Sequence, residues 1–392
     1  MQQSVPSTYF CLSLFYFFFF AALGVFVPYW SLYLKSEGFS AAEIGELMAI
    51  VMASKIVAPY FLAWLADHFQ QRLRIIQLSL VLTVIVFSGV FIDQSYWWLA
   101  TIMAVFGFFW NASLPLFEAL AFNHLADNPH RYSHVRLWGS VGFIVSVVSL
   151  PLVIEQRGLS LLPVLLIILL LLNGVSTLFI SDKNPLEHVS STVQKMPEII
   201  KSPLVIVFLL ACSLQAISHG AYYTFFSIYM GEHQYSHTMI GWMWGLGVIA
   251  EVILFIFMHR LLARFGACQL FNIALFVTAI RWVILALWID NVGFLIVAQL
   301  FHAASFGLFH SSAIHLIHQL FLGKFQARGQ ALYAGLSFGL GGAIGNLICG
   351  YTWDWLGSTW TFLGSALIAL FATVISVIYV RKRNLPSIPS SR

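Results

Sequence analysis

The sequence has 392 residues, of which 60% are hydrophobic and 9% charged, and its formal net charge is +4. Soluble domains carry about 25% charged residues, so a core surrounded by water could not cover this much apolar surface, and lipid is the expected solvent. The cations lie in separate loops and not in one clustered patch, so we expect no nucleic-acid partner.

Twelve apolar runs follow one another along the chain. Each is long enough to cross about 30 Å of hydrocarbon, which takes about 20 helical residues. None shows the alternation of polar and apolar residues typical of a membrane barrel strand. The predicted spans are 8–34, 41–67, 74–92, 96–124, 135–154, 159–181, 204–230, 238–262, 267–289, 291–320, 327–353 and 359–380. The expected fold is an all-α integral membrane protein with twelve transmembrane helices in two six-helix bundles.

The longest polar segment, residues 182–203, contains three prolines and mixed charges and separates six spans from the next six. We therefore expect an N-terminal bundle at 1–181, a cytoplasmic linker at 182–203, and a C-terminal bundle with a short tail at 204–392. Most loop cations fall on the side of the linker, and positive residues stay cytoplasmic. These cations are Arg72, Arg74, Arg131, Lys183, Lys195, Lys201, Arg260, Arg264, Lys324, Arg328, Arg381, Lys382 and Arg383. Both termini are thus expected in the cytoplasm.

The two halves repeat a pattern at an offset of 196 residues, half the length of the chain. At this offset Ser31 matches Ser227, and Ile44 matches Ile240. Lys55 then falls opposite Glu251, so one copy carries a cation where the other carries an anion. Repeated bundles of this kind bind their substrate between the repeats near the middle of the membrane.

Few charged residues lie deep in the apolar runs: Lys55, Glu118, Glu251 and Arg281, with Arg136 at the edge of the fifth span. An unpaired charge there costs about 2.5–3.5 kcal/mol on insertion scales, and ionisable residues at this depth are functional by default. The alternative is that they form static ion pairs between helices.

Two histidines, His219 and His302, lie in the middle of spans, and histidine can relay protons near neutral pH. Ser311, His315 and His318 share one helix face, which we expect to line a water-filled cavity; the alternative is that these histidines only pack against neighbouring helices. No Glu or Cys completes a metal site around these histidines, and the four cysteines have no metal or disulfide spacing. We expect neither a metal nor a cofactor.

Several aromatic residues also lie in the middle of spans, where they could stack on a ring or a sugar face. Those that we assign to substrate binding are Trp30, Tyr222, Tyr223 and Trp244. Packing and lipid contact are the alternative reading of each.

Residues 63–72, AWLADHFQQR, resemble the loop signature of the major facilitator superfamily; Asp67 and Arg72 are kept, and Ala63 replaces the usual Gly. The motifs VRLWGSVGF (135–143), HGAYYTFFSIY (219–229) and GVIAEVILF (247–255) resemble the 3-phenylpropionate (hydrocinnamate) permease family of proton symporters. This resemblance implies the major facilitator fold and a gating role for the loop.

More distantly, FEALAF (117–122) followed by Arg136 is similar to the substrate-contacting pair of the lactose permease family. By that resemblance Glu118 and Arg136 would contact substrate, and Glu251, Arg281 and His302 would couple the proton. Where that family carries a second carboxylate after the histidine, this chain has Ser305. The proton is therefore assigned to Glu251.

We expect proton-driven import of a small organic solute, an aromatic carboxylate such as 3-phenylpropionate, by alternating access. Arg136, Lys55 or Arg281 would attract the carboxylate, and His219 would join the proton-coupling residues. A sugar or nucleoside proton symporter, or a proton-driven drug or sugar exporter, is the alternative. The sequence shows no pairing of a nucleophile with a base, so we do not expect an enzyme. The expected partners are the substrate, protons and the lipid of a bacterial inner membrane, and the expected state is a monomer.

Overall fold

The computed structural model describes residues 8–125, 130–181 and 197–379. Within these ranges it contains twelve helices that are long and apolar enough to cross a membrane. They are Thr8–Ser36, Ala41–Phe69, Arg72–Phe91, Tyr96–Leu125, Arg131–Arg157, Leu159–Phe179, Pro203–Glu232, His237–Phe265, Ala267–Trp288, Val292–Leu320, Gln326–Leu356 and Ser358–Tyr379. The predicted all-helical fold with twelve spans is confirmed. Most of the predicted linker, the cations Lys183 and Lys195, and the cationic tail lie outside the described residues.

Several helix ends follow from local sequence. Ser40 caps α2 (Ala41–Phe69): its hydroxyl accepts from the backbone N–H of Glu43, whose carboxylate accepts from the N–H of Ser40, as in a capping box. The backbone at Gly266 and Gly357 has a positive φ of 73° and 84°, which glycine adopts without strain, and new helices start directly after them. In the loop before α4 (Tyr96–Leu125), the hydroxyl and N–H of Ser95 donate to Asp93 at 2.6 and 3.0 Å. These bonds hold the pKa of the Asp93 carboxyl below its usual value.

The internal repeat is visible in the helix bounds. Both ends of α2 lie 196 residues before the corresponding ends of α10 (His237–Phe265). Lys55 and Glu251 are therefore equivalent residues, each at the middle of its helix. The predicted offset is confirmed, and so is the exchange of a cation for an anion at one repeated position.

Three of the spans contain a stretch of π-helix, and in the described residues all three stretches belong to the second half of the sequence. They are η4 (Ala221–Phe225), η5 (Ala303–Leu308) and η7 (Ala334–Gly341). A π-helical turn inserts an extra residue into the helix and is frequent at functional sites. The sequence analysis did not anticipate these turns.

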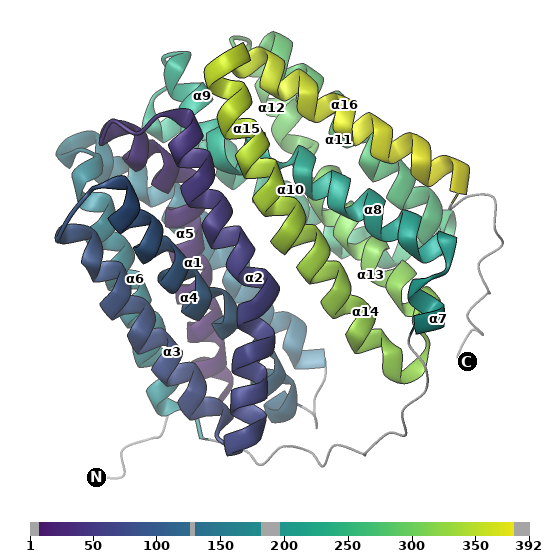
Figure 1. The fold of residues 1–392 in the computed structure, drawn as a ribbon, viewed down its shortest axis with the longest axis horizontal. Helices are drawn as coiled ribbons and strands as arrows, with labels where there is room; N and C mark the ends of the chain where they lie inside the picture. Colours follow the sequence, from purple (N-terminus) through teal and green to yellow (C-terminus); the bar gives the residue numbers. More distant parts are fainter. Residues whose placement is uncertain (1–7, 126–129, 182–196, 380–392) are drawn as a thin grey trace. The chain divides into compact units, whose positions relative to one another are not determined.

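By their contacts the helices form two compact units, Met1–His188 with Tyr223–Gly245, and Val189–Tyr222 with Leu246–Arg392. In the first unit, α1 (Thr8–Ser36) packs on α5 (His130–Arg157) and α6 (Leu162–Ser176), while α4 packs on α2 and α3 (Arg72–Phe87) (Figure 1). A Cβ on Gly142 would collide with the backbone of Phe17, which explains why α5 approaches α1 so closely.

Residues 223–245 join the first unit through specific contacts. Lys35, at the end of α1, forms an ion pair with Glu232 at the end of α9 (Phe226–Glu232). The carboxylate of Glu155 accepts the N–H of Thr238 at 3.0 Å, and Gly241 lies against the backbone oxygen of Val147. These units have other bounds than the expected bundles at 1–181 and 204–392. The division into those two bundles stays a prediction.

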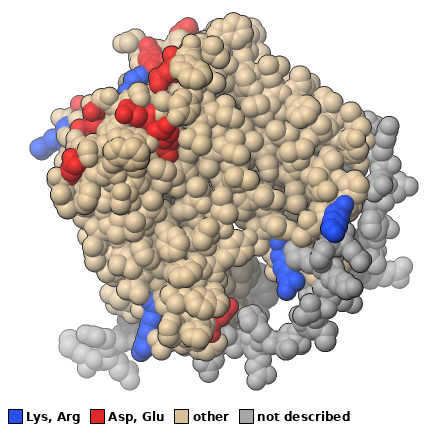
Figure 2. All heavy atoms as spheres, in the orientation of Figure 1, with Lys and Arg blue, Asp and Glu red and all other residues tan. Residues whose placement is uncertain are grey.

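In the second unit, α11 (Ala267–Trp288) and α8 (Pro203–Ser218) both pack on α16 (Ser358–Tyr379) (Figure 1). Phe208, Phe271 and Phe309 meet in its apolar core. Charged side chains form only small groups on the face of the molecule in Figure 2, and uncharged residues make up most of it. Such a surface suits contact with lipid.

Candidate functional site

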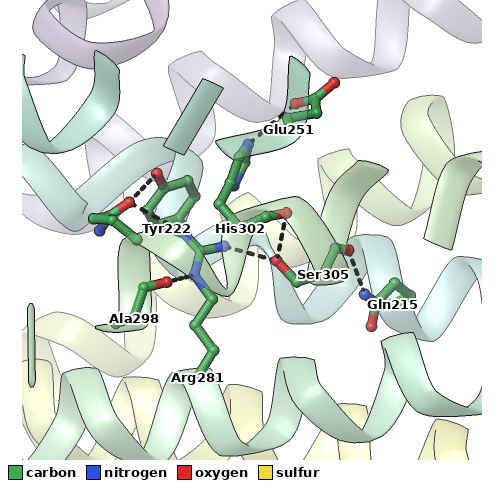
Figure 3. Close-up of polar contacts among 8 residues, drawn as sticks. Gln215, Tyr222, Glu251, Arg281, Ala298, His302 and Ser305 are labelled. Carbon is green, nitrogen blue, oxygen red and sulfur yellow. Dashed lines mark hydrogen bonds and ion pairs between the residues drawn. The ribbon is translucent and has the colours of Figure 1, made fainter. Parts of the chain in front are cut away.

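Arg281 lies at the centre of a polar cluster in the second unit (Figure 3). Its side chain is fully buried on α11 and donates hydrogen bonds to neighbouring oxygens. Nε donates to the backbone oxygen of Ala298 at 2.8 Å, Nη1 to the hydroxyl of Ser305 at 3.0 Å, and Nη2 to Oε1 of Gln299 at 3.3 Å. The guanidinium of a buried arginine stays charged, so these oxygens stabilise a permanent cation.

Two aromatic rings cover the guanidinium. Its central carbon lies 4.0 Å from the ring centroid of Tyr222 and 4.7 Å from that of Trp282. The Tyr222 hydroxyl also donates to Oε1 of Gln299 at 2.9 Å, so this oxygen accepts from both Tyr222 and Arg281. The predicted residues Tyr222 and Arg281 are thus brought together, and Tyr222 lies in the π-helical turn η4.

Glu251 and His302 form a carboxylate–imidazole pair beside this cluster (Figure 3). Oε2 of Glu251 lies 3.6 Å from Nε2 of His302, and the two side chains are 14% and 6% exposed. Glycines give them room: a Cβ on Gly247 would touch the His302 ring at 3.3 Å, and one on Gly307 would touch Cγ of Glu251 at 3.0 Å. A pair of this kind can share one proton in a site with little water.

His219 and Gln215, near the end of α8, contact the other side of the cluster. Nδ1 of His219 lies 2.8 Å from the backbone oxygen of Gln215, and its ring packs edge-on against Trp282. Gln215 donates to the backbone oxygen of Ser305 at 3.0 Å and to the hydroxyl of Thr278 at 2.7 Å. The predicted set Glu251, Arg281, His302 and His219 is therefore one connected cluster, whereas Gln215, Gln299 and Trp282 were missed by the sequence analysis.

In the first unit, Glu118 on α4 faces Arg136 on α5. Oε1 of Glu118 lies 4.0 Å from Nε of Arg136, and each side chain is 34% exposed. The guanidinium lies over two rings of α1, 4.1 Å from the centroid of Phe20 and 5.5 Å from that of Tyr16. The predicted pair is brought together, and Phe20 and Tyr16 add an aromatic wall that the sequence analysis did not assign.

Lys55 is half-buried in the middle of α2. Among the described residues it has neither a carboxylate within ion-pair distance nor a hydrogen-bond partner. The neighbouring α2 backbone is held to α4 instead, because Asn111 donates to the oxygens of Val51 and Ser54, both at 2.9 Å. Lys55 therefore does not form, within the described residues, the static ion pair that the sequence analysis considered.

The other predicted aromatic residues differ in their surroundings. Trp30 is fully buried in the first unit, with the rings of Phe26, Tyr33 and Phe87 at 5.8, 5.0 and 5.1 Å, so its contacts are those of a packing residue. Trp244 stacks with Tyr223 at 6.3 Å and donates to the hydroxyl of Ser227 at 2.9 Å. Their binding roles stay predictions.

The predicted loop signature forms an ion pair, with Nη2 of Arg72 3.1 Å from Oδ1 of Asp67. On α13 (Phe309–Leu320), His318 accepts from Gln330 at 2.8 Å, and His310 lies 3.0 Å from the hydroxyl of Tyr333. His315 and Ser311 are half-buried on the same helix. The described ranges contain no group of three or more His, Cys, Asp or Glu side chains that could hold a metal ion.

Comparison with known proteins identifies the family of the chain. Residues 9–364 match the MFS_1 like family. The chain is 28% identical over 383 residues to a probable 3-phenylpropionic acid transporter of Escherichia coli K12, which covers 96% of this chain and 98% of the relative. It is 25% identical over 344 residues to a maltose permease of Geobacillus stearothermophilus, covering 86% of each. A crystal structure of a mutant of the nucleoside transporter NupG superposes with a TM-score of 0.80 at 16% identity, over 96% of this chain and all of that one.

Proposed function

Because the chain belongs to the MFS_1 like family and is a multi-pass secondary transporter of the major facilitator superfamily, we propose that it imports a small aromatic carboxylate together with protons. In this proposal the first unit binds the anion, the second unit binds the proton, and the protein opens to the two sides of the membrane in turn. The cations of the first unit support the proposed substrate class, and the Glu251–His302 pair supports the proposed coupling.

Lys55 is the observation that carries the proposal. A half-buried ammonium group in the middle of a membrane helix is costly unless water or an anion solvates it. Other cations in the described spans have contacts that account for them: Glu118 and two rings for Arg136, and three acceptors and two rings for Arg281. Lys55 has no such contact there, and a substrate carboxylate would supply the missing charge.

The surroundings of Arg136 support an aromatic substrate. Its guanidinium already lies over the rings of Phe20 and Tyr16, so apolar ring surface and positive charge are adjacent. A molecule with a phenyl ring and a carboxylate matches both features, since the ring can stack and the carboxylate can pair. The similar Escherichia coli protein is a probable transporter of 3-phenylpropionic acid, which has this chemistry.

The proton is assigned to the Glu251–His302 pair. When the protein faces outward, a proton on Glu251 removes a buried negative charge and lowers the cost of closing the site around it. When the protein faces inward and the substrate has left, water reaches the pair and the proton departs. Arg281 stays charged throughout and favours this release through its positive field.

We further propose that the protein is a monomer in a bacterial inner membrane with both termini in the cytoplasm. The excess of loop cations on the side of the expected linker supports this orientation through the positive-inside rule. A monomer suffices because one chain carries both the proposed anion site and the proposed proton site.

A second candidate is a proton symporter for sugars or nucleosides. The carboxylate of Glu118, which is 34% exposed, could accept hydrogen bonds from hydroxyl groups. One similar protein is a maltose permease. This candidate gives Lys55 no anion to bind, and we rank it second for that reason.

The test is uptake of radiolabelled 3-phenylpropionate, maltose and uridine into right-side-out membrane vesicles with an imposed proton gradient. We expect 3-phenylpropionate alone to accumulate, and a protonophore to abolish the accumulation. Lys55→Met should lower its uptake rate about tenfold or more, as expected from losing a contact to a charged group of roughly 1.5–3 kcal/mol.

Lys201→Met is the matched control, because Lys201 is exposed in the segment before α8, outside the proposed site. It should leave uptake unchanged. Accumulation of maltose or uridine in place of 3-phenylpropionate would favour the second candidate. Full 3-phenylpropionate uptake by Lys55→Met would contradict the role of Lys55.

A further inference from the structure

We propose that His310 receives the proton that leaves the Glu251–His302 pair, so that the span Val292–Leu320 contains the proton-release path. The inference rests on the proposed proton coupling and adds a residue and a route to it. It comes from a row of rings along this span and from one buried nitrogen of His302.

Three rings lie in register along the span. His302 and Phe306 have ring centroids 5.7 Å apart, and Phe306 and His310 have centroids 6.0 Å apart, with an interplanar angle of 5° in both pairs. The π-helical turn η5 lies between the two histidines and carries Phe306. Phe306 and His310 are half-buried, whereas His302 is buried, so the row leads from an enclosed position to a more accessible one.

Nδ1 of His302 is the second observation. This buried nitrogen has no hydrogen-bond partner among the described residues, and His302 as a whole is 5% exposed. A buried ring nitrogen left without a hydrogen-bond partner destabilises the folded protein. Ordered water is the usual partner of such a group, and a water bound at Nδ1 would be the first step away from the Glu251–His302 pair.

The proton balance of this route is simple. The carboxyl of Glu251 gives its proton to Nε2 of His302, and the resulting imidazolium gives up the proton on Nδ1 to water. The water passes a proton beside Phe306 to the His310 ring, which then releases it to bulk water. Titratable or charged groups that face His302 include Glu251, Tyr222, Arg281 and His219, and those that face His310 include Tyr333.

Tyr333 holds the receiving ring in place. Its hydroxyl lies 3.0 Å from Nδ1 of His310, and Tyr333 itself is buried at the end of α14 (Gln326–Tyr333). The Tyr333 hydroxyl can donate to this nitrogen or accept from it, so the contact orients the His310 ring in both neutral tautomers.

The experiment uses purified full-length protein in proteoliposomes with 3-phenylpropionate as the probe and a trapped pH dye. His310→Phe keeps an aromatic ring in the row but cannot bind a proton. We expect it to slow 3-phenylpropionate-driven proton entry about tenfold or more, as for loss of a proton-transfer group. Exchange of labelled for unlabelled 3-phenylpropionate, which needs no net proton release, should be unchanged. Added imidazole should partly restore proton entry.

His259→Phe is the control, since His259 is exposed on α10 and makes none of the ring contacts of the row, and it should behave like the unsubstituted protein. Normal proton entry in His310→Phe would overturn the inference, and so would an equal loss of exchange, which indicates a structural role. If the unsubstituted protein exchanges 3-phenylpropionate but moves no protons, the proposed coupling fails, and the route fails with it.

Discussion

The hydroxyl of Ser305 accepts a hydrogen bond from Nη1 of Arg281, with 3.0 Å between the two atoms. Ser305 occupies the position at which the lactose permease resemblance places a second carboxylate. Here a neutral oxygen holds the buried guanidinium at this point, and the carboxylate beside His302 is Glu251, from another helix. This arrangement supports the assignment of the proton to Glu251.

Ser305→Ala should lower the stability of the protein. The substitution leaves a buried N–H of a charged group without this acceptor, which costs about 1–3 kcal/mol. Thermal unfolding in detergent measures the change. Ser312→Ala is the matched control, because the Ser312 hydroxyl is buried on the same span without a hydrogen-bond partner in the described residues. Equal melting temperatures for the two variants would show that the Ser305–Arg281 bond contributes nothing.

Gly220→Ala should destabilise the second unit by overpacking. A Cβ at Gly220 would lie 2.9 Å from the backbone nitrogen of Asn346 and still closer to the backbone of Gly345, so one of the helices must move. Overpacking of this kind costs about 1–3 kcal/mol.

Gly364→Ala is the comparison for this substitution, because nothing lies within 4 Å of a Cβ at Gly364 on α16. It should stabilise the helix by about 0.5–1 kcal/mol, the propensity difference between the two residues. Melting temperatures that shift in opposite directions are expected. A neutral result for Gly220→Ala would mean that the helices separate there without cost.

Asp67→Asn should slow transport more than it lowers stability. Asp67 is 56% exposed in its ion pair with Arg72, and exposed pairs contribute about 0–1 kcal/mol. The resemblance to the major facilitator loop signature nevertheless implies a role in the transport cycle. Uptake kinetics and thermal unfolding of the same preparation separate the two effects. Unchanged uptake would show that this loop does not act in gating here.

The number, order and limits of the spans were predictable because burial in lipid needs long continuous apolar helices, a signal that composition carries directly. The equivalence of Lys55 and Glu251 in the two repeats was also predictable, since the offset fixes which positions correspond. The helix bounds confirm both.

The π-helical turns at η4, η5 and η7 were not predictable from apolar periodicity. Such a turn adds one residue to an otherwise continuous apolar helix, and contacts with neighbouring helices decide whether it forms. The packing of residues 223–245 with α1 and α5 is likewise a long-range contact that no local pattern contains.

The candidate site was predictable in part. Charged residues in apolar runs identified Glu251, Arg281, Glu118 and Arg136, because their desolvation cost makes each one conspicuous. Gln215, Gln299 and Phe20 were missed, since an amide or a phenyl ring in a membrane helix has no comparable cost. Trp30 resembled the other aromatic residues that lie in the middle of a span, and only its enclosing rings indicate a packing role.

The most direct test of the account measures net uptake and exchange of 3-phenylpropionate by Glu251→Gln in proteoliposomes. Glutamine keeps the size of the side chain and its ability to accept a hydrogen bond, but it holds no titratable proton. We predict that proton-driven accumulation is lost while exchange of labelled for unlabelled substrate persists. Accumulation at the level of the unsubstituted protein, with the same proton entry, would contradict the account.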